Sequence, residues 1–199
     1  MKKLSLILIS LFFLINSTFA NTYSSDPKMF VSELVNDAIS KLSDKNLTEE
    51  EKSTFIEGVA IENVDINALG LYTLGELRKS TDKNSLENYQ QAFKKYFLKS
   101  LTSRLTDYSS NKFEIINAEK KSSNYTIVKS KIIAIDNQPE IKIDWRIYTK
   151  NPEKPLIRDL IVEGLSLART QKEEFSSILN SNNNDINILI SKLEEFING

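Results

Sequence analysis

The chain contains 199 residues, of which 40% are hydrophobic and 27% are charged, and its formal net charge is −1. Such a composition is typical of one globular domain and excludes fibrous and intrinsically disordered proteins. The balanced charge also excludes a strongly basic surface, so no nucleic acid is expected among the partners.

Residues 1–20 are expected to form a cleaved secretory signal peptide. Lys2 and Lys3 precede a twelve-residue, mostly apolar run, and the small residues Thr18 and Ala20 lie at the positions that signal peptidase reads. A membrane anchor is the alternative, but a helix needs about 20 apolar residues to span a bilayer. We therefore expect a single domain over residues 21–199, exported and without a permanent membrane anchor.

The expected mature chain is mildly acidic. Loss of the two lysines leaves 24 basic side chains against 27 acidic ones, a net charge of −3. The chain also has no cysteine, although disulfides form readily in exported compartments. The fold is therefore expected to be held by packing alone.

The first half of this domain is expected to be helical. Asp26 and Pro27 form a helix start, with the acid as cap and the proline at the first helical position. Thr48 and Glu51 have the spacing of a capping box, which predicts a second helix. A third, short helix is expected over 66–74, where Gly70 and Gly75 indicate close backbone packing or a helix end.

The longest helix is expected over 85–108. Its apolar positions recur every three or four residues, which predicts an amphipathic helix with an aromatic stripe. The stripe consists of Tyr89, Phe93, Tyr96, Phe97, Leu101 and Leu105.

The second half is expected to contain an antiparallel meander. Four segments have the pattern of strands: 112–117, 125–135, 140–149 and 156–162. Polar turns at 136–139 and 151–155 join the last three. The third segment alternates cleanly, so one of its faces is expected to be buried and the other solvated. The phase of the second slips near Lys129 to Lys131, as a bulge would cause.

After the last strand the chain is expected to turn at Glu163 and Gly164 and to end in two helices. These helices are expected over 170–179 and 186–197, with a polar loop between them. The fold class is therefore α+β, with helices on one face of an antiparallel meander sheet of about four strands.

Catalytic chemistry has few candidates. Without histidine or cysteine, the usual nucleophile–base pairs and the usual zinc or copper ligands are missing. Asp144, Asp159 and Glu163 lie on adjacent strands and suit either a glycosidase-like carboxylate pair or exposed and capping acids. We predict no catalytic residue, no metal site and no cofactor.

Apolar surface is the remaining signal. If the long helix packs on the sheet, its stripe faces the apolar side of the third strand. The two sets are Phe93, Phe97 and Leu101 on the helix and Ile143, Trp145 and Ile147 on the strand. They would form either a filled core or a cavity for an apolar ligand, because a stripe alone does not distinguish the two.

Two blocks of residues carry a family resemblance. The first comprises Asp159, Ile161, Glu163, Gly164, Ser166, Thr170, Glu174 and Phe175. The second comprises Leu74, Gly75, Lys79, Ser80, Glu87, Tyr89, Phe93 and Tyr96. Both blocks, and the order of elements around them, resemble the MlaC family, the periplasmic phospholipid-binding proteins also called the toluene-tolerance auxiliary family. The resemblance covers nearly all of 21–199.

The resemblance implies that helices wrap a curved sheet and enclose a deep apolar cavity for acyl chains. It implies a monomeric, non-enzymatic, periplasmic phospholipid carrier that maintains the lipid asymmetry of the outer membrane. Its expected partners are an outer-membrane lipoprotein with a porin and an inner-membrane ABC transporter with a periplasmic substrate-binding domain. An exported enzyme or an interaction protein on a similar fold is the alternative.

Eleven apolar side chains are the expected lipid-binding residues, because they lie on the faces that would line such a cavity. They are Leu71, Leu74, Phe93, Phe97, Leu101, Ile133, Ile143, Trp145, Ile147, Val162 and Leu165.

Overall fold

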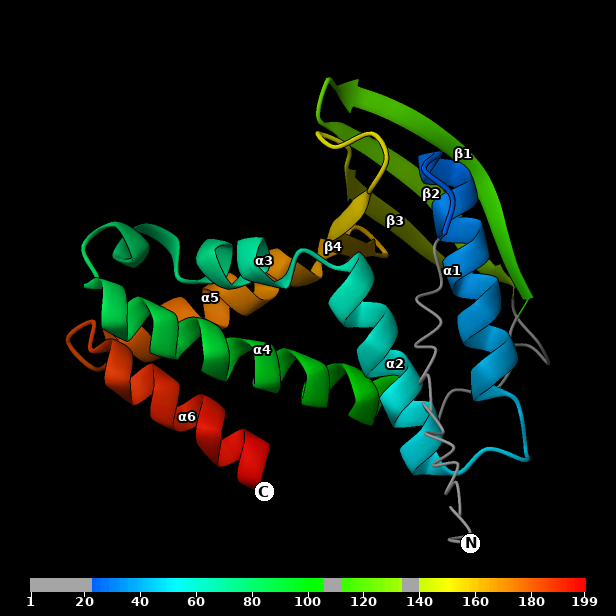
Figure 1. The fold of residues 1–199 in the computed structure, drawn as a ribbon. Coiled ribbons are helices and arrows are strands. Elements are labelled where there is room, and N and C mark those ends of the chain that lie inside the picture. The colour runs from blue at the N-terminus through cyan, green and yellow to red at the C-terminus, as the bar shows by residue number, and fades with distance from the viewer. Residues whose placement is uncertain (1–22, 106–111, 134–139) are drawn as a thin grey trace, which may run out of the picture.

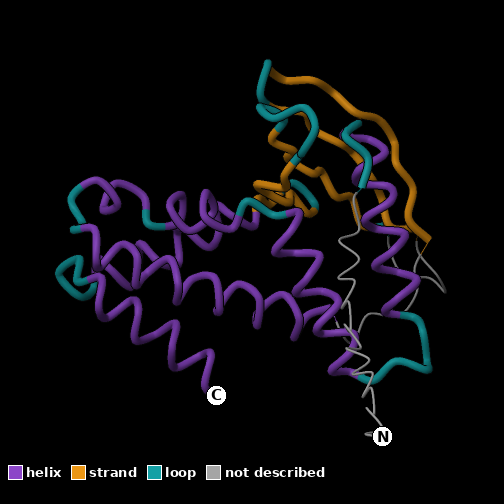
Figure 2. The backbone as a smooth tube through the Cα atoms, viewed as in Figure 1, coloured by secondary structure: helices purple, strands orange, loops and turns teal. Residues whose placement is uncertain are grey.

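The computed structural model describes residues 23–105, 112–133 and 140–199. Figure 1 shows an antiparallel sheet with helix α1 across one face, and a second group of helices, α3 to α6, beside it. Helix α2 runs between the two groups, and the division into helices and strands is clear along the backbone (Figure 2). The expected α+β class is confirmed. The predicted signal peptide and the 136–139 turn lie outside the described residues.

Local capping explains the first two helices. α1 spans Pro27–Leu42, and the side chain of Asp26 accepts a hydrogen bond from the backbone N–H of Met29. α2 spans Glu49–Asn63 and begins with the predicted capping box, in which Thr48 and Glu51 each bond the other's backbone N–H. Both predicted helix starts are confirmed.

The two glycines of the third helix have different roles. α3 spans Ile66–Thr73 and is followed by the 3₁₀ helix η1, Gly75–Lys79. A Cβ at Gly70 would lie 2.9 Å from Cδ1 of Phe93, so this glycine allows close packing on α4, which spans Lys83–Leu105. Gly75 has a φ of +61°, the left-handed conformation in which helices commonly end.

The sheet is a meander in which each strand pairs with the next in sequence. Its strands are β1 Lys112–Ser122, β2 Tyr125–Ile133, β3 Ile141–Tyr148, β4 Leu156–Val162 and β5 Leu165–Ser166. β1 extends beyond the predicted end at 117, because its polar second half continues to pair with β2. The two-residue β5 is an addition to the four predicted strands.

The bulge predicted in β2 lies in β1 instead. Ile115 pairs with Ser130 and Asn117 pairs with Lys129, so Ile116 is the extra residue. β2 itself alternates regularly, because Ser130 points into the core, where its hydroxyl accepts a hydrogen bond from Trp145 Nε1 and donates one to the carbonyl of Ile143. In the sequence, this buried serine interrupts the alternation of apolar and polar residues, and the interruption was mistaken for a bulge.

A tight hairpin turn connects the sheet to the last two helices. Glu163 has a φ of 50° and Gly164 a φ of 84°, as a two-residue turn between β4 and β5 requires. α5 spans Leu167–Asn180 and begins three residues before the predicted start, since Ser166 caps its first turn. α6 spans Ile186–Asn198, as expected, and Asp185 is its N-cap.

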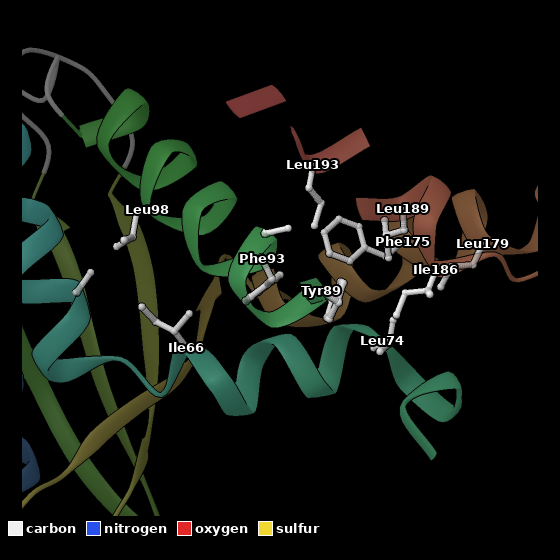
Figure 3. Close-up of a cluster of buried hydrophobic side chains, with 12 residues drawn as sticks. Ile66, Leu74, Tyr89, Phe93, Leu98, Phe175, Leu179, Ile186, Leu189 and Leu193 are labelled. Atoms are coloured by element: carbon white, nitrogen blue, oxygen red, sulfur yellow. The ribbon is translucent and has the colours of Figure 1, made fainter. Parts of the chain in front are cut away.

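The buried side chains form two cores. The helical core, shown in part in Figure 3, joins α4 to its neighbouring helices and consists of Ala60, Ile66, Leu74, Tyr89, Ala92, Phe93, Leu98, Phe175, Leu179, Ile186, Leu189 and Leu193. The sheet core consists of Phe30, Val31, Leu34, Val128, Trp145, Ile147 and Ile157. Val64, at the end of α2, packs against both cores.

The expected packing of the α4 stripe on Trp145 is therefore wrong. Phe93 stacks on Phe97 and meets Phe175 of α5 edge to face, with ring centroids 6.2 Å apart in each pair. Trp145 instead belongs to the core that the sheet shares with α1. The periodicity of the sequence correctly identified the buried face of α4 and that of β3, but these two faces do not pack against each other.

Candidate functional site

A pocket lies on the face of the sheet opposite the sheet core, between the strands and helix α3. Its volume is about 740 Å³, which is within the usual range for small-molecule sites of about 300–1,000 Å³. It is lined by Ala68, Leu69, Tyr72, Lys121, Ser122, Tyr125, Ile127, Lys129, Asp144, Arg146, Arg158, Asp159, Ile161 and Ala168.

The two walls of this pocket differ in chemistry. The helical wall has no charged group and consists of Ala68, Leu69, Tyr72 and Ala168. The sheet wall has two apolar side chains, Ile127 and Ile161, and all six charged ones. Because Ile127 pairs with Arg146 and Ile161 pairs with Asp144, these apolar and charged groups are direct cross-strand neighbours on one face. The pocket is therefore amphipathic.

Arg158 fastens the start of α3 to the sheet at one end of the pocket. Its Nε and Nη2 donate to Oδ2 of Asp65 at 2.8 and 2.7 Å, and its Nη1 donates to the Tyr125 hydroxyl at 2.8 Å. The guanidinium also stacks on Tyr148, 3.4 Å from the ring centroid. Partial burial acts to lower the pKa of Arg158, but the bonds to Tyr125 and Asp65 outweigh it and raise this pKa. The arginine is thus a fixed positive charge.

Asp159 fastens the start of α5 at the pocket wall. It is 4% exposed, its Oδ1 accepts the Ala168 backbone N–H at 3.0 Å, and its Oδ2 accepts the Ser166 hydroxyl at 2.7 Å. Nη1 of Arg146 lies 3.7 Å from the same Oδ2. Both carboxylate oxygens are therefore occupied by helix capping, which agrees with the capping role and not with the glycosidase-like one.

Glu163 also has a structural role. Its carboxylate accepts the backbone N–H of Lys142, and its own N–H donates to the Lys142 carbonyl at 3.0 Å. These two bonds continue the pairing of β3 and β4 beyond Val162, up to the turn at Gly164. Glu163 therefore fixes the end of the β3–β4 pair, next to the turn that leads to α5.

The eleven predicted lipid-binding residues fall into three groups, and none of them lines the pocket. Leu74, Phe93, Phe97 and Leu101 lie in or against the helical core. Ile143, Trp145 and Ile147 lie in or against the sheet core. Outside both cores, Leu71, Ile133 and Val162 are half-buried and Leu165 is exposed. The structure therefore does not bring these residues together around one space.

The pocket residues carried a weak sequence signal. The strand face that carries Asp144 and Arg146 was expected to be solvated, yet Ile127 and Ile161 of the two neighbouring strands lie on the same face. Apolar residues on an otherwise charged strand face indicate that something covers that face. The α3 residues could not be assigned in this way, because a short helix has too few turns to define a second face.

Other classes of site are missing from the described ranges. Across 23–105, 112–133 and 140–199, no three acidic side chains gather closely enough to hold a metal ion. Within the same ranges, none of the helices has the length and apolar character needed to cross a bilayer.

Comparisons with known proteins agree with this fold. The sequence model of the family described as MlaC protein matches residues 32–195. A solved structure of a phospholipid-binding protein from Ralstonia solanacearum, determined in complex with a phospholipid, is similar in fold, with a TM-score of 0.68. The two sequences are 17% identical, and the similarity covers 84% of this chain and 94% of the other.

Proposed function

The chain belongs to the MlaC family, and from this premise we propose that it is a phospholipid carrier of the periplasm and not an enzyme. The observation that carries the proposal is the amphipathic pocket between α3 and the sheet, whose helical wall is uncharged and whose sheet wall bears the charged groups. A phospholipid has the same division into acyl chains and a charged head group. The Ralstonia protein of similar fold was crystallised with such a ligand.

We propose that acyl chains enter along the uncharged wall. Leu69 lines the pocket and also packs against the helical core, so it lies between the pocket and that core. A small outward shift of α3 would let a chain pass Leu69 and reach the predicted side chains of the helical core. Leu74, Phe93, Phe97 and Leu101 are therefore the proposed acyl-chain contacts on this route, and the other seven predicted residues remain proposals that this route does not reach.

The energetics explain why such a carrier would deliver lipid by docking. Burying a chain of about 15 methylenes is favourable by roughly 12 kcal/mol at about 0.8 kcal/mol per methylene, so release into water is negligible. A bilayer interior is equally apolar, so transfer between the pocket and a membrane complex is nearly balanced. Contact with a partner would therefore control loading and unloading.

The proposed partners follow from the family. They are an outer-membrane lipoprotein with a porin and an inner-membrane ABC transporter with a periplasmic substrate-binding domain. We propose that the carrier moves lipid between these complexes as a monomer and so maintains outer-membrane asymmetry. Export to the periplasm would use residues 1–20 as a signal peptide and leave 21–199 as the mature domain.

Native mass spectrometry of the mature protein from a bacterial periplasm tests this function. We expect a mass excess equal to one phospholipid, which extraction after denaturation releases and identifies. A bare mass, even after incubation with phospholipid vesicles, would contradict the proposal and favour an interaction protein with a filled core.

A further inference from the structure

Arg146 is a pocket cation whose hydrogen-bonding capacity is little used. It lies on β3, its side chain is 45% exposed, and Nη1 approaches Oδ2 of Asp159 only to 3.7 Å. That oxygen already accepts the Ser166 hydroxyl at 2.7 Å. A guanidinium has five N–H donors, and the described residues offer Arg146 no shorter ion pair than this one.

The surroundings of Arg146 are positive although the whole chain is not. The pocket lining contains four cations, Lys121, Lys129, Arg146 and Arg158, against two acids, Asp144 and Asp159, a net charge of +2. The chain as a whole has a net charge of −1. Asp65 and Glu119 lie outside the lining but pair with Arg158 and with the two lysines, so Arg146 is the lining cation to which an anion would be drawn most strongly.

Neighbouring contacts leave Arg146 as the cation best able to bind a ligand. Arg158 is committed to Asp65 and to Tyr125. Lys121 and Lys129 both bond Glu119, and these bonds lower the pKa of Glu119 to about 2, so that carboxylate stays ionised. Asp159 is committed to the start of α5.

We propose that Arg146 binds the phosphate of the bound lipid by paired N–H···O bonds, with Lys129 as a second positive charge. The planar guanidinium fits two oxygens of a phosphodiester, and charge-assisted bonds of this kind are the stronger class. This inference rests on the proposed function, which it deepens by assigning the head-group contact. It places the phosphate on the sheet wall and the acyl chains on the wall formed by α3.

The test compares Arg146→Gln with wild type and with Lys142→Gln. Lys142 is exposed on the same face of β3, but it does not line the pocket. Each protein is incubated with vesicles that contain phosphatidylglycerol or the diacylglycerol with identical chains, and bound lipid is measured by native mass spectrometry. Arg146→Lys, which keeps the charge but loses the planar fork, is measured in parallel.

In wild type we expect phospholipid to be loaded in preference to diacylglycerol. Arg146→Gln should lower phospholipid loading about tenfold and leave diacylglycerol loading unchanged, since one charged hydrogen-bonding contact is lost. Phospholipid loading of Arg146→Lys should lie between that of Arg146→Gln and that of wild type. Phospholipid loading of Lys142→Gln should equal that of wild type. Equal phospholipid loading in Arg146→Gln and wild type would overturn the assignment while leaving the carrier function in place.

A second experiment tests whether the anion at this site is free phosphate instead of a lipid head group. Binding of inorganic phosphate is followed by ³¹P NMR in the lipid-free protein. Suppose that wild type binds phosphate, that this binding requires Arg146, and that wild type loads no lipid. This result would overturn both the carrier function and the assignment of a lipid head group as the ligand. Lipid loading that free phosphate at millimolar concentration does not displace supports the head group as the source.

Discussion

Gly70 of α3 and Phe93 of α4 are packed so closely that there is no room for a methyl group between them. A Cβ built at Gly70 would lie 2.9 Å from Cδ1 and 3.3 Å from Cγ of the Phe93 ring, and also 3.3 Å from Gln90 Oε1. This contact sets how near α3 lies to the helical core, and therefore the position of the helical wall of the pocket.

Gly70→Ala should destabilise the protein by about 1–2 kcal/mol, because overpacking at the ring outweighs the higher helix propensity of alanine. Gly58 of α2 is the matched control, since a Cβ there meets nothing within 4 Å. Gly58→Ala should stabilise by about 0.5–1 kcal/mol. Urea unfolding measures the free energy of unfolding of both variants. A Gly70→Ala protein as stable as Gly58→Ala would contradict the prediction and show that α3 moves away from Phe93 at no cost.

Ser130→Ala should cost about 1–3 kcal/mol, because Trp145 Nε1 loses its acceptor in a buried site. Ser103→Ala, an exposed change on α4, should stay within about 0.5 kcal/mol of wild type. Trp145 is the one tryptophan of the chain, so its fluorescence reports the unfolding transition of both variants. Identical midpoints for the two variants would contradict a structural role for the Ser130–Trp145 bond.

The stability of the protein at acid pH should depend on the ion pairs between Glu119 and its two lysine partners. Hydrogen bonds from Lys121 and then Lys129 lower its pKa to about 2 in the folded protein, against about 4.3 in an unfolded chain. Its contribution is therefore fully present above about pH 4.3 and is lost as the pH falls towards about 2.

Glu119→Gln should accordingly reduce stability at neutral pH and have a diminishing effect below about pH 4. Glu153→Gln is the control, because this exposed carboxylate has no ion pair within the described residues. Denaturation midpoints of the three proteins between about pH 2 and 7 provide the measurement. A difference between wild type and Glu119→Gln that does not change with pH would show that the two lysines do not control this carboxylate.

Phe97→Ala should weaken lipid retention more than it weakens folding. Phe97 is half-buried against the helical core, where we propose that an acyl chain arrives. Phe196→Ala removes an aromatic ring that is 43% exposed on α6 and packs on Tyr96, so it controls for the loss of a ring that is not a proposed lipid contact. Dissociation of bound lipid to acceptor vesicles is compared for both variants, and equal rates would count against Phe97 as a lipid contact.

Local signals in the sequence predicted most elements of the fold. Asp26, Thr48 and Asp185 start helices through bonds to residues two or three positions later, so their effect is visible in a short window. The turn at Gly164 is equally local. The order of the strands followed from their short connections.

The partners of the buried faces could not be predicted in this way. A stripe such as that of Phe93 and Phe97 shows that a face is covered, but not whether a sheet or another helix covers it. The buried Ser130 was misread, since its partner Trp145 lies on the next strand. The pocket was missed because its walls come from α3 and from the charged face of the sheet, which only the folded chain brings together.

The contact of Val64 with both cores has a mechanical consequence. Val64 also forms a bridge with Ile157 of β4, so the helical group and the sheet meet at the end of α2. The helical wall of the pocket belongs to the helical group and the charged wall belongs to the sheet, and each group has its own packed interior. A change in the angle between the two groups at this joint would widen or narrow the pocket, and it would also load the Arg158–Asp65 and Asp159–Ala168 bonds that tie the helices to the sheet. Retention of the proposed lipid would then depend on this angle, and the proposed docking partners would release the lipid by changing it.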